Sequence, residues 1–484
     1  MKKVADILSG IQDYQSTGPT DLEITGVCFD SRKVVAGNIF VAVRGTRVDG
    51  HDFIHDAIAG GCTAVVCETL PDKREKEICY IRVESAGYAL GVICSNFFDQ
   101  PSKKLKLIGV TGTNGKTTVA TLLYRIATRL GYRSGLISTI EVLISDRSVE
   151  ATHTTPDALQ INRTLAEMVK EDCSYCFMEV SSHAIDQNRI AGLRFAGGIF
   201  TNLTHEHLDY HKDFRHYLNS KKIFFDNLPA ASFALTNLDD RNGRIMIQNC
   251  QARAKTYSLK TISDFKGRVL ESHFDGMQLK INDRDVWTTF MGEFNAYNIL
   301  AVYACCLILS FDKNDVLTAL SGLRPVRGRA EVVTGKSGVV TIVDYAHTPD
   351  ALKNIIESVD RIRSGGQKLI TVVGAGGNRD REKRPLMGSI AASGSDRVIL
   401  TSDNPRDESP EAIIDEMKTG ITEDEMEKVL SIVDRKEAIK TAIMLAGRGD
   451  IVLVAGKGHE TYQDIAGKKI HFNDLEVIHK IMNM

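Results

Sequence analysis

The sequence predicts an α/β protein of three domains, and three observations support this prediction. Its 484 residues suffice for two to four domains of about 100–200 residues each. Continuous apolar runs alternate with helical patterns along most of the chain, which is typical of parallel sheets covered by helices. Two polar segments, "FFDQPSKKLK" and "SGLRPVRGR", interrupt this alternation. We therefore expect domains at residues 1–102, 103–328 and 329–484.

The expected strands follow one another in each domain. The first domain has the short runs "EITGVCFD", "NIFVAV" and "TAVVCE", with a helical "FIHDAIAGG" before the last. The second has "LIGV", "SGLIST", "YCFMEV", "GGIFTNL" and "ASFALTN", which suit a parallel sheet. The third has "VVTIVDY", "KLITVVG", "RVILTSD" and "DIVLVAG", with a helix after each of the first three. This second alternation predicts a separate α/β unit.

Composition and charge exclude several classes of protein. A net charge of −2 gives no reason to expect broad binding to nucleic acid or to acidic membranes. Ten cysteines in a chain of this length are too dilute for a disulfide scaffold. The C-x-x-C of Cys173 and Cys176 lacks a second pair at zinc spacing, so these thiols and Cys305–Cys306 are expected to be buried. The N-terminus lacks a long apolar stretch and no run is long enough to span a bilayer, which favours a cytoplasmic protein.

A phosphate-binding loop is predicted between the run "LIGV" and the helical "TTVATLLYRIATRL". Val110 stands where the common G-x-x-x-x-G-K-[ST] pattern has glycine, but Gly112 to Thr117 keep the rest. In this context, backbone N–H groups and the helix N-terminus face phosphate. Lys116 would then reach the β- and γ-phosphates, and Thr117 would bind Mg²⁺. The loop predicts a nucleoside triphosphate without naming the reaction.

Candidate metal ligands follow two later strands. Glu179 ends the run "CFMEV", where open α/β sheets place ligands, although a solvated acid would also fit. The segment "TNLTHEHLDYHKDFRHYLNSKKIFF" carries four histidines but no H-E-x-x-H, so a zinc site is one reading. A histidine that helps to hold a second Mg²⁺ is another, although Mg²⁺ prefers oxygen ligands.

A lysine is predicted on the inward face of the next helix. Phe214, Tyr217, Leu218, Lys221, Phe224 or Phe225, and Leu228 share one face. Lys222 lies about 100° around the helix and is expected to be solvated. Burial lowers the pKa of an amine and makes it nucleophilic, so Lys221 could take up CO₂ as a carbamate, an oxygen ligand for Mg²⁺. A salt bridge or snorkelling remains the alternative.

Six motifs in this order resemble those of the Mur ligases of bacterial peptidoglycan synthesis: "TGTNGKTT", "MEVSSHAIDQNR", "NLTHEHLDYH", "GEFNAYN", "VDYAHTPDAL" and "VAGKGHE". The resemblance covers nearly the whole chain and includes the phosphate loop with Val110. It implies a UDP-binding N-terminal α/β domain, a P-loop ATPase-like central domain and a Rossmann-like C-terminal domain that binds an amino acid. It also implies an ATP-driven amide bond, formed through an acyl phosphate on the D-Glu γ-carboxylate of UDP-N-acetylmuramoyl-L-Ala-D-Glu.

The resemblance also implies roles for individual residues. Those expected to act in catalysis or at Mg²⁺ are Lys116, Thr117, Glu179, His207 and Lys221 as a carbamate. Those expected to bind ATP are Gly112, Thr113, Asn114, Gly115, Lys116, Thr117, Thr118, Asn295, Asn298, Arg329, Asp344 and His347. Those expected to bind the UDP-linked substrate are Ser31, Thr46, Arg47, Val48, Thr154, Thr155, Ser181, Gln187 and Arg189. His153 stands where many relatives have Asn, which puts one substrate contact in doubt.

The run "SDNPRDE" resembles the motif that selects meso-2,6-diaminopimelate. The matching pocket residues are Arg379, Asp403, Asn404, Pro405, Arg406, Gly456 and Glu460. The physics agrees, because an Arg fork pairs with the distal carboxylate of diaminopimelate and would repel the ammonium of lysine. Without the resemblance, this run would be a turn before a helix. "VVGAGGNRD" is only a weak match to a dinucleotide fingerprint, and we expect no redox role.

Three alternatives remain open. The first is a sister ligase that adds L-lysine, and the second is a ligase that resembles folylpolyglutamate synthase. The third is a P-loop motor or switch that would hydrolyse ATP without any muramyl substrate. We expect small-molecule substrates, Mg²⁺, no nucleic-acid or membrane partner, and a monomer.

Overall fold

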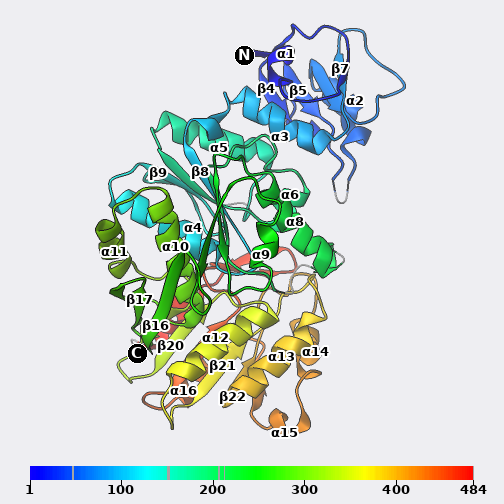
Figure 1. Cartoon of the computed structure of the whole chain (residues 1–484). Coiled ribbons are helices and arrows are strands. Elements are labelled where there is room, and N and C mark those ends of the chain that lie inside the picture. Colours follow the sequence, from blue (N-terminus) through cyan, green and yellow to red (C-terminus); the bar gives the residue numbers. More distant parts are fainter. Residues whose placement is uncertain (46–47, 150–152, 205–207, 212, 483–484) are drawn as a thin grey trace.

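The computed structural model describes residues 1–45, 48–149, 153–204, 208–211 and 213–482. Its three principal sheets follow one another along the chain, and the three units that they form are arranged in the same order in space (Figure 1). Helices cover their faces, so the predicted α/β class is confirmed. In the described part of the chain, no helix combines the length and apolar character needed to cross a bilayer.

The N-terminal sheet has five strands, and four of them are parallel to one another. Its order is β2 (Gln15–Thr17), β7 (Cys79–Arg82), β6 (Ala64–Cys67), β5 (Asn38–Val41) and β4 (Gly26–Cys28), with β2 antiparallel. The short pair β1 (Lys2–Lys3) and β3 (Glu23–Ile24) lies apart from it. The helices are α1 (Val4–Ile7), α2 (Ile54–Ala59) and α3 (Ala86–Phe97), with 3-10 turns η1 (Ser31–Lys33), η2 (Gly50–Phe53) and η3 (Pro101–Lys103). Helix α3 lies between this sheet and the middle of the molecule (Figure 1).

The central sheet is mixed and has eleven strands. Its order is β11 (Arg147–Val149), β10 (Val142–Ile144), β9 (Ser134–Ile137), β12 (Tyr175–Glu179), β8 (Lys106–Thr111), β13 (Gly197–Phe200), β14 (Phe233–Asn237), β15 (Arg253–Ser258), β16 (Phe265–His273), β17 (Gly276–Ile281) and β18 (Arg284–Thr288). The strands from β9 to β16 are parallel, as the apolar runs predicted, and both ends of the sheet are antiparallel.

Two hydrophobic cores sandwich the central sheet. One contains α4 (Lys116–Arg129), α10 (Glu293–Ile308) and α11 (Lys313–Ser321), and includes the buried Cys305 and Cys306. The other contains α5 (Ala158–Lys170), α6 (Ser182–Asp186) and α8 (Phe214–Asp226), and includes Cys173 and Cys176. The prediction that these four cysteines are buried is confirmed. Short α7 (Leu208–His211) and α9 (Gly243–Met246) complete this unit.

The C-terminal sheet has six strands and is antiparallel only at one edge. Its order is β19 (Glu331–Thr334), β20 (Val340–Asp344), β24 (Ile451–Ala455), β21 (Leu369–Val373), β22 (Arg397–Leu400) and β23 (Val429–Ser431). Its helices are α12 (Pro349–Ile362), α13 (Lys383–Gly394), α14 (Pro410–Lys418), α15 (Glu423–Met426), α16 (Arg435–Leu445) and α17 (Asp474–Met482). A separate hairpin pairs β25 (Tyr462–Ile465) with β26 (Lys468–His471).

Candidate active site

The phosphate loop occupies the turn between β8 and α4. Gly112 has a φ of +150°, and a Cβ there would lie 1.9 Å from Thr201 Oγ1. Gly115 has a φ of +87°, and a Cβ there would lie 2.4 Å from Asn298 Oδ1. Both positions therefore require glycine. The backbone N–H of Asn114 donates to Asn202 Oδ1 at 2.9 Å, which fixes the loop against the end of β13.

Two lysines converge on the carbonyl oxygen of Gly112. Lys116 Nζ donates to it at 2.9 Å and to Thr113 O at 2.7 Å. Lys221 Nζ donates to the same oxygen at 2.9 Å and lies over the Tyr217 ring, 4.7 Å from its centroid. Lys221 is 1% exposed, so the predicted inward face of α8 is confirmed. Two lysine amino groups thus meet where the loop would hold phosphate.

The prediction that Lys222 is solvated was wrong. Its side chain is only 12% exposed, and its Nζ donates to both carboxylate oxygens of Asp226, at 2.6 and 2.7 Å. The two residues are four positions apart, so one turn of α8 brings them together.

Glu179 is fully buried at the end of β12. Its carboxylate accepts hydrogen bonds from Thr139 N at 2.7 Å and Thr139 Oγ1 at 3.2 Å. A solvated acid at this position is therefore ruled out. His207 lies outside the described residues, and no group of three His, Cys, Asp or Glu side chains within them could hold a metal. His211 lies in the core, where burial and the nearby His183 lower its pKa to about 4.

A cavity opens beside the phosphate loop, between the central and C-terminal sheets. Seven of the residues predicted to bind ATP line it: Asn114, Gly115, Thr118, Asn298, Arg329, Asp344 and His347. Its other lining residues are Asn202, Phe294, Tyr345, Ala346, Ala351, Asn354 and Ile355, which the sequence prediction missed. Asn295 lies behind the wall and accepts a hydrogen bond from Asn298 Nδ2 at 3.1 Å.

Two hydrogen bonds join the C-terminal unit directly to the phosphate loop. Arg329 Nη2 donates to Thr117 Oγ1 at 3.2 Å, and Asn114 Nδ2 donates to Asp350 Oδ2 at 3.1 Å. The Arg329 guanidinium lies over the Tyr345 ring at 4.4 Å, and its Nε is buried without a partner among the described residues. Burial raises the pKa of Asp344, which accepts from Ala330 N and Ala346 N. An unpaired guanidinium donor beside a phosphate loop suits an anionic ligand.

Five of the residues predicted to bind the UDP-linked substrate form one network next to Glu179. Thr155 Oγ1 donates to Glu179 O at 2.8 Å and accepts from Ser181 N at 3.1 Å. Arg189 Nη1 donates to Thr155 O at 2.8 Å, and its Nη2 donates to Gln187 Oε1 at 2.6 Å. Thr154 Oγ1 accepts from Thr139 Oγ1 at 3.1 Å.

The predicted residues of the N-terminal unit lie apart from this network in sequence. Ser31 begins the turn η1, and Val48 is 56% exposed. Thr46 and Arg47 lie outside the described residues.

The "DNPR" loop lies at the carboxyl end of β22. Arg406 has a φ of +52°, and backbone hydrogen bonds to the hairpin hold it: Arg406 N donates to Asp464 O, and Ala466 N donates to Arg406 O. A Cβ on Gly376 would lie 3.1 Å from Arg406 Nη1 and 3.7 Å from Arg379 Cγ. Both predicted arginines therefore border the same glycine.

Two carboxylates lie in or beside this loop. Glu460 Oε2 accepts from Asn404 Nδ2 at 2.8 Å and from Lys457 Nζ at 2.9 Å. Asp403 Oδ2 is buried without a partner among the described residues, 2.6 Å from where a Cβ on Gly456 would lie. The sequence prediction missed Lys457, although it lies in the quoted run "VAGKGHE" and is fully buried.

A three-sheet α/β fold with a phosphate loop and an adjoining cavity is typical of an ATP-binding enzyme, and the comparison with protein families identifies the family. The profiles described as "Mur ligase family, catalytic domain", "Mur ligase middle domain" and "Mur ligase, glutamate ligase domain" match residues 23–99, 110–306 and 328–458. The chain belongs to the Mur ligase family.

Individual relatives point to one member of the family. A protein of Cytophaga hutchinsonii named UDP-N-acetylmuramoyl-L-alanyl-D-glutamate–2,6-diaminopimelate ligase is 54% identical over 99% of each chain. One of Bacteroides fragilis with the same name is 54% identical over 100% of this chain and 99% of its own. A solved structure of a ligase of that name has a TM-score of 0.70 and 32% identity, covering 100% of this chain and 99% of its own.

More distant structures share the fold. A MurF ligase of Thermotoga maritima, solved in complex with ADP, has a TM-score of 0.61 at 20% identity and covers 96% of this chain and 97% of its own. A folylpolyglutamate synthase of Mycobacterium tuberculosis has a TM-score of 0.61 at 16% identity and covers only 75% of this chain and 91% of its own.

Proposed function

We propose that this chain adds meso-2,6-diaminopimelate to the D-Glu γ-carboxylate of UDP-N-acetylmuramoyl-L-Ala-D-Glu, with ATP as the energy source. The names of the relatives that are 54% identical support this activity. The choice of diaminopimelate as the added amino acid rests on one observation: Arg379 and Arg406 both approach Gly376. The reaction would serve cytoplasmic synthesis of peptidoglycan precursors in a monomeric enzyme.

The phosphate loop would bind ATP and stabilise charge on its phosphates. Lys116 and Arg329 both contact the loop, and rigid donors at such sites stabilise the charge that develops during phosphoryl transfer. The substrate γ-carboxylate oxygen attacks the γ-phosphorus, the bond to the β-phosphate oxygen breaks, and ADP leaves. The amine of diaminopimelate then attacks the acyl phosphate carbon, loses a proton and displaces inorganic phosphate.

The residues near the loop fit Mg²⁺. Thr117 Oγ1 and the Glu179 carboxylate are oxygen donors, the kind of ligand that Mg²⁺ prefers. Lys221 as an amine does not fit, because an ammonium group repels a cation, whereas its carbamate would present oxygen atoms. We propose that Thr117, Glu179, His207 and carbamylated Lys221 hold Mg²⁺, which neutralises phosphate charge when bound.

The "DNPR" loop would select the amino acid by its distal end. That end of diaminopimelate carries both a carboxylate and an ammonium group. Arg379 and Arg406 would pair with the carboxylate, while Asp403 and Glu460 would pair with ammonium. L-Lysine lacks the distal carboxylate and would leave both arginines unpaired, which disfavours a lysine-adding enzyme.

Phosphate release from ATP tests this function. The assay contains UDP-N-acetylmuramoyl-L-Ala-D-Glu with meso-diaminopimelate, with L-lysine or with no amino acid. We expect steady release only with diaminopimelate. Equal release without an amino acid would indicate an uncoupled ATPase, and release only with lysine would indicate the sister ligase.

A further inference from the structure

Two glycines bring the N-terminal and central units into direct backbone contact. Gly91 lies inside α3, where glycine costs about 1 kcal/mol relative to alanine. A Cβ at Gly91 would lie 2.5 Å from Ala191 O and 2.7 Å from Ala191 Cβ. Gly192 has a φ of +74°, and a Cβ there would lie 2.9 Å from Gly91 O and from Val92 Cα. Neither segment has room for a side chain at this crossing.

The loop at this crossing carries residues of the proposed substrate site. Arg189 N donates to Ala184 O at 2.8 Å, and Ala191 N donates to Asn188 O at 3.0 Å, so the turn is tight. The Arg189 side chain holds both Thr155 and Gln187. A displacement of Ala191 would therefore move Arg189 and the groups that it holds.

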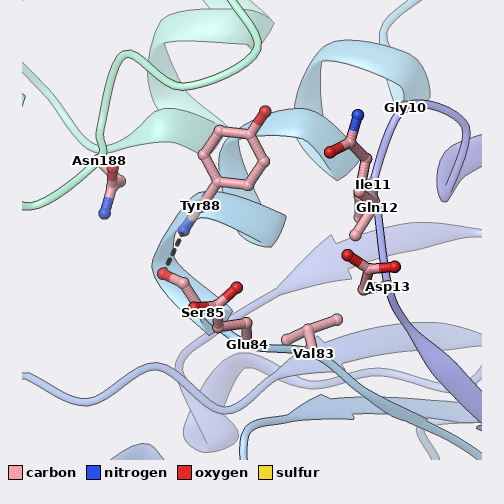
Figure 2. Close-up of a pocket in the computed structure, with 9 residues that line it drawn as sticks. All are labelled: Gly10, Ile11, Gln12, Asp13, Val83, Glu84, Ser85, Tyr88 and Asn188. Atoms are coloured by element: carbon pink, nitrogen blue, oxygen red, sulfur yellow. Dashed lines mark hydrogen bonds between the residues drawn. The ribbon is translucent and has the colours of Figure 1, made fainter.

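The opposite face of α3 belongs to the core of the N-terminal unit. Ala89, Leu90 and Ile93 pack there with Ile39 and Val41 of the N-terminal sheet. Beside the crossing lies a cavity of about 450 Å³, which is lined mostly by the N-terminal unit and by Asn188 of the central unit (Figure 2). Asn188 faces this cavity from the loop, Tyr88 from α3, and Gly10 to Asp13 from the far side. The backbones of α3 and of the loop at Gly192 thus touch only locally, next to this cavity.

We propose that Gly91 and Gly192 are positioning residues for the UDP-linked substrate. We place the uridine end of this substrate at Ser31 in the N-terminal unit and its peptide end at Gln187 and Arg189, so the contact between the two glycines sets the distance between these two half-sites. One substrate molecule must reach both half-sites, so a shift of about 1 Å between them weakens binding of the whole molecule. Each half-site remains intact. This inference rests on the proposed function.

Alanine at two positions of one helix tests the proposal. Gly91→Ala introduces the clash with Ala191, whereas Gly87→Ala is the matched control, because a Cβ there would have its nearest atom, Gln187 O, at 3.8 Å. We expect Gly91→Ala to raise KM for UDP-N-acetylmuramoyl-L-Ala-D-Glu at least tenfold. KM for ATP and the Kd of UDP alone, which reports on the uridine half-site, should change less than twofold. Gly87→Ala should match the wild type in all three.

Gly192→Ala approaches the same contact from the loop and keeps the proposal testable if Gly91→Ala does not fold. It should raise the same KM and leave the Kd of UDP unchanged. Equal KM values in Gly91→Ala and Gly87→Ala would overturn the proposal, as would a parallel loss of ATP and UDP binding. A wild-type enzyme that does not use the muramyl substrate would instead refute the proposed function itself.

Discussion

Arg406 is the residue on which the amino-acid choice depends most. We expect Arg406→Ala to lower kcat/KM for meso-diaminopimelate more than tenfold, because a hydrogen bond to a charged group contributes about 1.5–3 kcal/mol. KM for ATP should stay unchanged, since the ATP cavity is lined by other residues. Steady-state kinetics with each substrate varied in turn measures both constants.

Arg381→Ala is the matched control for this variant. Arg381 is 67% exposed and pairs with Glu416, so its loss should leave diaminopimelate turnover within twofold of the wild type. If Arg406→Ala kept wild-type kcat/KM for diaminopimelate, the assignment of the pocket would be wrong.

Lys221 provides a second test at the scale of a single residue. Its buried amine lies against the phosphate loop, and we propose that a carbamate forms on it. The wild-type enzyme freed of CO₂ should lose most of its activity and regain it on addition of bicarbonate. Lys221→Ala should be inactive in both conditions, and Lys222→Ala should behave like the wild type. A fully active Lys221→Ala, or a wild-type enzyme indifferent to bicarbonate, would refute the carbamate.

The phosphate loop is the element whose backbone leaves least freedom for substitution. Gly115 and Gly131, at the two ends of α4, share a φ of +87°, so alanine carries the same backbone strain at both. Only at Gly115 would the new Cβ clash, 2.4 Å from Asn298 Oδ1, whereas Gly131 has nothing within 4 Å.

Gly115→Ala should therefore raise KM for ATP more than tenfold, while Gly131→Ala should cost only about 1 kcal/mol of stability and leave KM for ATP unchanged. Kinetics and thermal unfolding of both variants measure these effects. Equal KM values for ATP in the two variants would mean that backbone strain, and not the clash with Asn298, determines how the loop binds ATP.

The parallel strands of the central and C-terminal sheets could be predicted from sequence because they are buried on both faces and read as unbroken apolar runs. The antiparallel end of the central sheet from β16 to β18 mixes buried and exposed residues and escaped prediction. The hairpin β25–β26 escaped as well, since it is mostly exposed and its role is to hold Arg406 by backbone hydrogen bonds. Such contacts leave no side-chain pattern in the sequence.

The candidate site shows the same limit. Residues inside recognisable motifs, such as Lys116 and Glu179, could be placed in advance. Tyr345, Asp350 and Asn354 meet the phosphate loop or its cavity only because the C-terminal unit folds over it. Lys222 was misjudged because only its direction around the helix was considered, although the spacing of four residues to Asp226 already indicated an ion pair.

Buried histidine should make the stability of the protein depend on pH in the acid range. Burial, reinforced by Arg329 and Arg327, lowers the pKa of His459 to about 3. In the unfolded chain a histidine titrates near about 6.5, so between these values only the unfolded state binds the proton. Stability should therefore fall as the pH drops from about 6.5 towards 3. By pH 5 this one group would cost about 2 kcal/mol.

His459→Gln should remove this contribution and make the unfolding free energy depend less steeply on pH between 7 and 5. Urea titrations of both proteins at several pH values measure the difference. A variant whose stability falls as steeply as that of the wild type would contradict the assignment.

Two arginines on neighbouring loops, Arg379 and Arg406, are proposed to make this ATP-driven ligase specific for diaminopimelate. The most direct test is a competition in which the enzyme receives UDP-N-acetylmuramoyl-L-Ala-D-Glu, ATP and equal concentrations of meso-diaminopimelate and L-lysine. Mass spectrometry then identifies the product. We predict that the diaminopimelate adduct exceeds the lysine adduct by at least tenfold. Equal amounts of both adducts, or an excess of the lysine adduct, would contradict the claim.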